Sequence, residues 1–92
     1  MLQEQINKDY IQAMKSRDQL RSATLSFLRA QLKNVMIDQR TETLDDGQVT
    51  AIIKKQVKQR QDSIEQYESG NRPDLADKEK QELSILKSYL PE

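Results

Sequence analysis

Apolar residues recur at intervals of three and four along almost the whole of this chain of 92 residues. An α-helix makes one turn in about 3.6 residues, so this spacing gathers apolar side chains on one helical face, whereas a strand would need strict alternation. The longest run of this kind covers residues 19–39. The spacing therefore predicts amphipathic helices and an all-α fold.

Four segments carry the pattern, and each is bounded by polar or turn-forming residues. We predict helices over residues 2–16, 19–39, 45–69 and 73–90. The connections between these segments are short, which favours antiparallel packing of sequential helices. With only two Gly and two Pro, the chain lacks the turn residues of a β-protein. The prediction is a four-helix antiparallel hairpin or bundle arrangement.

The second segment, residues 19–39, is predicted to be the central helix. Phe27 lies on its main apolar stripe and is expected in the core. Leu25 and Ile37 lie off that stripe, so a second contact surface is expected on their side of the helix. On the first segment, Met14 belongs to the inward face.

The start of the third helix carries a capping signal. Asp45 followed by Gln48 has the spacing of a capping box, in which the carboxylate accepts a backbone N–H and the Gln side chain reaches back. Thr43 with Asp46 has the same spacing and would begin the helix two residues earlier. Both choices place the helix start in the same short loop.

Other helix ends carry similar signals. Ser16 or Asp18 is placed to cap the second helix. After the third helix, Gly70 is expected in the left-handed conformation, because glycine adopts it at the least cost. Asn71 is then expected to cap the fourth helix, with Pro73 in its first turn.

The residue types exclude several kinds of site. The chain contains no cysteine and no histidine, so disulfides and the usual zinc and iron ligand sets are not expected. Its serines have no histidine to activate them, and no phosphate-binding glycine loop is present. Asp45 with Asp46, and Glu79 with Glu82, are carboxylate pairs better explained by helix capping and ion pairing than by a metal. We expect no cofactor, no metal and no catalytic residue.

The first residues lack the basic start and apolar run of a secretory signal. No segment approaches the roughly 20 consecutive apolar residues that cross a bilayer. We therefore expect a cytoplasmic protein with no membrane partner.

The charge is balanced overall but uneven along the chain. Residues 1–60 hold eleven basic and seven acidic side chains, and residues 61–92 hold four and eight. Repeated cations on two helices are candidates for phosphate contacts, since each neutralised phosphate adds salt-dependent affinity. Residue content alone favours a solvated helical surface. The candidate nucleic-acid-binding residues are Arg21, Arg29, Lys33, Lys54 and Lys58.

Arg60 differs from these surface cations because its register on the third helix points inward. An unpaired guanidinium would be costly there, so a carboxylate partner is expected. Glu79 and Glu82 on the neighbouring helix are the candidates. We interpret the three residues as a structural ion pair, with ligand binding as the alternative.

Several motifs in this order resemble the YqeY-like family. They cover almost the whole chain and are Lys15-Ser16-Arg17-Asp18-Gln19-Leu20-Arg21, Thr24-Leu25, Leu28-Arg29-Ala30, Leu32-Lys33-Asn34, Leu44-Asp45-Asp46 followed by Val49, Ile53, Lys58 and Arg60, Gly70-Asn71-Arg72-Pro73-Asp74-Leu75 and Tyr89-Leu90-Pro91. The family is related to the tail region of the tRNA-dependent amidotransferase B subunit. The resemblance implies that residues 1–92 are one helical domain, the N-terminal part of a YqeY-like protein, without the family's smaller C-terminal helical domain.

Three functions follow as hypotheses. The resemblance favours a non-catalytic accessory module associated with tRNA. The alternative is a protein-protein interaction or oligomerisation module, in which exposed apolar residues meet another protein or a second copy; Leu25, Ile37 and Val57 are the candidates. Amidotransferase-type carbon-nitrogen ligase activity, with glutamine as amide donor, is the least favoured.

Overall fold

The computed structural model describes residues 1–91 and confirms the predicted all-α fold. The helices are α1 (Leu2–Lys15), α2 (Gln19–Gln39), α3 (Asp46–Ser69) and α4 (Pro73–Lys87). No strand occurs within the described range. Each predicted segment therefore forms a helix, although the last one ends earlier than expected.

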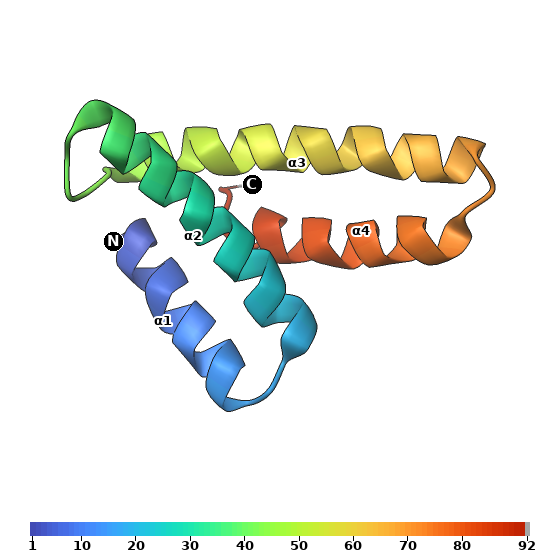
Figure 1. Cartoon of the computed structure of the whole chain (residues 1–92), viewed down its shortest axis with the longest axis horizontal. Coiled ribbons are helices and arrows are strands. Elements are labelled where there is room, and N and C mark those ends of the chain that lie inside the picture. Colours follow the sequence, from blue (N-terminus) through green and yellow to red (C-terminus); the bar gives the residue numbers. More distant parts are fainter. Residues whose placement is uncertain (92) are drawn as a thin grey trace.

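The helices form two antiparallel hairpins that cross at an angle (Figure 1). One hairpin consists of α1 and α2, and the other consists of α3 and α4. Figure 1 shows the first hairpin lying obliquely across one end of the second, so that the far end of the α3–α4 hairpin extends beyond α1 and α2. The resulting molecule measures 42 × 29 × 26 Å.

A single apolar core lies where the two hairpins cross. Its buried members come from all four helices and from the connection before α3, where Leu44 is only 5% exposed. Burial of such side chains is the main favourable contribution to folding. The core residues are Ile6, Leu25, Leu28, Leu32, Leu44, Val49, Ile53, Val57 and Leu86.

The structure corrects the expected burial of two residues of α2. Leu25 is completely buried, whereas Phe27 is 51% exposed. The physical reason is that Leu25, Leu28 and Leu32 form their own i, i+3, i+7 row, and this row faces both α1 and α3. Phe27 lies outside that row.

Val57 and Met14 also differ in exposure from what the sequence predicts. Val57 is buried in the core, so of the three residues proposed to meet a partner only Ile37, at 62%, is exposed. Met14 was expected to face inward, but it is 55% exposed. The face of α1 that packs against α2 and α3 is set by Ile6 and Ala13, and Met14 falls beside that face.

Two helices begin with the side-chain caps expected from the sequence. Asp45 Oδ1 accepts from the Gln48 backbone N–H at 2.8 Å, and Gln48 Oε1 accepts from the Asp45 backbone N–H at 3.1 Å. This reciprocal pair is the predicted capping box. At α2, Asp18 rather than Ser16 is the cap, with its Oδ1 accepting from the Arg21 backbone N–H.

The end of α3 differs from the prediction. Gly70 has a φ of −85°, and the left-handed conformation is taken by Asn71, at φ 58°. The helix ends at Ser69 as predicted, but the left-handed residue comes one position later than expected. Asparagine is the residue that best tolerates this conformation after glycine. The expected cap by Asn71 is therefore wrong, and α4 begins at Pro73 without a side-chain cap.

Polar contacts hold the chain ends against the body. The Leu2 backbone N–H donates to Asp46 Oδ1 at 2.9 Å, which ties the start of α1 to the start of α3. At the other end, the Tyr89 hydroxyl donates to Asp9 Oδ2 at 2.6 Å. Since Asp9 lies on α1, this bond joins the turn after α4 to the first helix.

Candidate functional site

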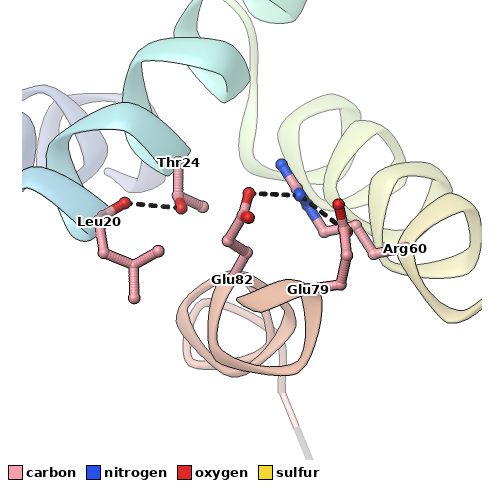
Figure 2. Close-up of polar contacts among 5 residues, drawn as sticks. All are labelled: Leu20, Thr24, Arg60, Glu79 and Glu82. Carbon is pink, nitrogen blue, oxygen red and sulfur yellow. Dashed lines mark hydrogen bonds and ion pairs between the residues drawn. The ribbon is translucent and has the colours of Figure 1, made fainter. Parts of the chain in front are cut away.

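Arg60 lies between two carboxylates on the facing helix (Figure 2). Its Nη1 donates to Glu82 Oε2 at 2.6 Å and to Glu79 Oε2 at 3.1 Å. The side chains of Arg60 and Glu82 are each 13% exposed, and that of Glu79 is 21% exposed. Such charge-assisted bonds are strong when they are shielded from water. The cluster links α3 to α4 beyond the apolar core.

Figure 2 also shows that α2 approaches this cluster, with Thr24 on the other side of Glu82 from Arg60. Thr24 is buried, and its hydroxyl donates to the Leu20 carbonyl of its own helix at 2.8 Å. The threonine therefore satisfies its hydrogen bond locally. Glu82 depends on Arg60 for its only charged partner in the described part of the chain.

The cluster lines a groove of about 760 Å³ between α2, α3 and α4. This volume lies within the range typical of ligand sites. The half-exposed Phe27 ring forms part of the groove, with its centre 5.8 Å from the Arg60 guanidinium carbon. The remaining lining residues are Gln19, Leu20, Ala23, Gln56, Gln59, Ser63, Lys78, Glu79 and Glu82.

Two buried polar groups at this groove have no partner within residues 1–91. Gln56 is 4% exposed, and neither its Nε2 nor its Oε1 makes a hydrogen bond. The Nε of Arg60 is also buried and unpaired. Buried side-chain polar atoms usually have a hydrogen-bond partner, so these three atoms are exceptions among the described residues.

The predicted nucleic-acid-binding residues do not all line the same groove. Arg29 and Lys33 line a groove of about 470 Å³ beside α1 and α2. Arg29 Nε donates to Asn7 Oδ1 at 2.9 Å, and its guanidinium lies 4.3 Å from the centre of the Tyr10 ring. Lys33 is exposed. Arg29 is thus partly occupied by contacts within the hairpin, and Lys33 is the more available cation.

Lys54 and Lys58 line a different groove, of about 650 Å³, between α3 and α4. Both side chains are exposed, but Asp62 and Glu65 line the same groove. Arg21 lies in the first turn of α2, where its side chain is half-buried. The structure therefore places four of the five candidates in two different grooves, and Arg21 lines neither of them.

A metal site and a membrane-spanning helix were also sought among the described residues. Within residues 1–91, no group of three or more acidic side chains is arranged to hold a metal ion. Of the four helices described there, none combines the length and the apolar character needed to cross a bilayer.

Comparison with known proteins places this fold in a family. A family model described as Yqey-like protein matches residues 3–92. The chain belongs to the YqeY-like family. The resemblance noted from the sequence motifs is thereby confirmed, and the four helices described above are those of a small helical YqeY-like module.

The family relatives include fungal proteins. The chain is 39% identical over 85 residues to "Altered inheritance of mitochondria protein 41, mitochondrial" of Vanderwaltozyma polyspora, and 38% identical over 85 residues to the protein of that name in Lachancea thermotolerans. Each match covers 92% of this chain and 46% of the relative. An uncharacterized protein of Schizosaccharomyces pombe is 33% identical, covering 99% of this chain and 73% of that protein.

Two consequences follow from these relatives. The YqeY-like chain spans about half the length of the first two relatives. Their names contain the word mitochondrial, which contradicts the cytoplasmic location expected from the sequence. That expectation rested on the absence of a secretory signal and of a membrane span, and neither absence distinguishes the cytoplasm from an organelle.

Sequence reasoning identified Arg60, Glu79 and Glu82 but not the other residues of the groove. Gln56 carried a signal, because it is a polar residue in the inward row of α3. Phe27 carried none, since an aromatic residue on an apolar stripe is usually in the core. The groove depends on three helices, and only their packing brings Phe27, Gln56 and Arg60 together.

Proposed function

We propose that this YqeY-like module is a non-catalytic accessory protein that associates with tRNA. The proposal is supported by the family's relation to the tail region of the tRNA-dependent amidotransferase B subunit. The structural observation that carries it is the presence of two cation-lined grooves, one holding Arg29 and Lys33 and the other holding Lys54 and Lys58.

The arrangement of these cations limits the kind of binding. Lys33, Lys54 and Lys58 are exposed, so they can exchange water and counterions for phosphate oxygens. The formal net charge of the chain is zero, and acidic residues share the second groove. We therefore propose a salt-sensitive association through few phosphate contacts, with Arg21 and Arg29 as secondary contributors.

Fluorescence anisotropy of labelled tRNA tests the proposal. The protein is titrated at about 50 mM and about 200 mM salt, where a phosphate-driven interaction weakens steeply. Because the first two relatives are named mitochondrial, mitochondrial tRNA is a suitable probe besides total tRNA. We expect binding at low salt, with a smaller salt slope for Lys33→Gln and for Lys54→Gln/Lys58→Gln.

The variants separate the two grooves. Each removed phosphate contact should lower the salt slope by about one. Lys87→Gln provides a matched control, since Lys87 is exposed in the last turn of α4 and lines neither groove. Absence of binding at low salt, or equal weakening by the control, would refute the proposal.

A further inference from the structure

The groove lined by Arg29 and Lys33, the α1–α2 groove, differs from the other two in the charge of its lining. These two cations are its charged residues, and none of the described residues that line it is acidic. The groove around Arg60 also contains two glutamates, and the groove between α3 and α4 contains Asp62 and Glu65. The α1–α2 groove is therefore the one of the three whose lining favours an anion throughout.

Arg29 is held in one orientation at this groove. Its Nε donates to Asn7 Oδ1 at 2.9 Å, and its guanidinium lies 4.3 Å from the centre of the Tyr10 ring. Both partners lie on α1, so packing of the hairpin fixes the side chain. This bond to Asn7 is the only one that the Arg29 side chain donates within residues 1–91, and its two Nη atoms are not buried. They form a fork that is open to a ligand.

Further donors surround this fork. Lys33 lies four residues after Arg29 and Ser26 lies three residues before it, so the three side chains share one flank of α2. Ser26 and Lys33 are exposed. The Nδ2 of Asn7 has no partner in the described part of the chain and is not buried. An anion in the groove can therefore meet two cations and two neutral donor side chains.

We propose that the α1–α2 groove binds a phosphomonoester, that is, a terminal phosphate group. Such a group carries about two negative charges at neutral pH and has three acceptor oxygens. The Arg29 fork binds two of these oxygens, and the Lys33 ammonium binds the third. A carboxylate has one charge and two oxygens, so it matches Arg29 but leaves Lys33 without a partner.

The inference rests on the proposed function in treating this groove as a phosphate contact, and it specifies the kind of phosphate. Within a polynucleotide each phosphate has a sugar on both sides, and the half-buried Arg29 is only a secondary contributor there. A terminal phosphate has a single substituent, so it can enter a concave groove of about 470 Å³. Its source is either a small phosphorylated molecule or the end of an RNA.

Titration of isotope-labelled protein with glycerol phosphate, followed by nuclear magnetic resonance at constant ionic strength, tests the inference. We expect saturable shifts of the Arg29 Nε–H and Asn7 side-chain amide signals, with a dissociation constant on the order of 1 mM because the site is open to water. Glycerol and acetate should not produce these shifts. Binding should weaken as the pH falls below about 6, because the phosphate loses a charge while Arg29 and Lys33 keep theirs.

Variants locate the site. Arg29→Lys keeps the charge but loses the fork, and Lys33→Gln removes one charge, so each should weaken binding at least about fivefold. Lys33 is exposed, so its variant is expected to fold, and circular dichroism verifies both. Lys87→Gln is the matched control, since Lys87 is exposed and lies outside the groove. No shifts at about 10 mM glycerol phosphate, equal binding of acetate, or equal weakening by the control would overturn the inference.

Competition with a short RNA identifies the source of the phosphate. Displacement of glycerol phosphate by an RNA with a terminal phosphate, but not by the same RNA without it, assigns the site to an RNA end. Displacement by neither RNA assigns it to a small phosphorylated molecule. Equal displacement by both would overturn the inference and leave the tRNA association intact. Binding of glycerol phosphate by a protein that does not bind tRNA would refute the proposed function and support the phosphomonoester site.

Discussion

At the scale of single residues, Arg60 illustrates how an ion pair depends on its shielding. Its two carboxylate partners are mostly shielded from water, so Arg60→Leu leaves two poorly solvated negative charges close to each other. We expect the free energy of unfolding to fall by about 2 kcal/mol, less than for a fully buried pair. Urea denaturation monitored by circular dichroism measures the loss.

The exposed pair of Lys80 and Glu68 provides the control for Arg60. Their side chains are 51% and 54% exposed, so Lys80→Gln should change stability very little. Adding Glu79→Gln/Glu82→Gln to Arg60→Leu should recover part of the loss, because the unpaired charges are removed. An Arg60→Leu variant as stable as the parent protein would show that the pair contributes nothing.

Tyr89 gives a prediction for alkaline pH. Burial, together with the hydrogen bond to Asp9 and its negative charge, raises the pKa of the Tyr89 hydroxyl well above its ordinary value of 10.0. The folded state therefore keeps a proton that the unfolded chain releases. The stabilisation by this group is complete below about pH 10 and is lost as the pH rises further toward the pKa of the folded state.

The Tyr89→Phe variant isolates this contribution. At pH 8 it lacks the bond to Asp9 and should be less stable by about 1 kcal/mol. Between pH 10 and pH 11.5, approximate limits taken from the tyrosine pKa, the difference between parent and variant should shrink. Urea midpoints at several pH values measure it. A difference that stays constant or grows at high pH would contradict the assignment to Tyr89.

At the scale of helices, α1, α2 and α3 are followed by the same backbone conformation. Non-glycine residues Arg17, Arg40 and Asn71 have positive φ of 60°, 55° and 58°. At each, two backbone bonds close the helix in a Schellman pattern, as where the Arg72 N–H donates to the Tyr67 carbonyl and the Asn71 N–H to the Glu68 carbonyl. The chain therefore ends its helices without glycine in the left-handed position.

Asn71 is the position where this strain is testable. Asn71→Ala should reduce the free energy of unfolding by about 1 kcal/mol, because alanine tolerates the left-handed conformation less well. Asn71→Gly should match or exceed the stability of the parent protein. Thermal unfolding compares the two variants. Equal stability of the alanine and glycine variants would show that φ at this position is not the controlling factor.

At the scale of the whole molecule, the shared core should make the two hairpins unfold together. Leu25 is completely buried between the hairpins, so Leu25→Ala should cost about 3 kcal/mol and destabilise both. Ile37→Ala, at a position 62% exposed, should have little effect. Hydrogen exchange resolved along the chain measures each hairpin. Loss of protection in α1 and α2 alone would mean that the α3–α4 hairpin is stable independently.

Part of the candidate site was predictable from residue chemistry. A guanidinium in the inward register of a helix needs a carboxylate, and the spacing of the next helix offered Glu79 and Glu82. The groove around this cluster was not predictable, because it depends on the angle between the two hairpins. The five cations proposed for RNA lie on two helices, and the packing of these helices decides that four of them line two different grooves.

The sequence by itself determined the helices, their order and most of their ends, because apolar spacing and capping are local properties of the chain. It left open on which side of Leu28 and Leu32 the buried face of α2 extends, because Leu25 on one side and Phe27 on the other both fit the helical period. Only the tertiary structure selected the side of Leu25, since burial depends on which side the other helices cover. That selection left Phe27 half-exposed and opened the groove beside Arg60.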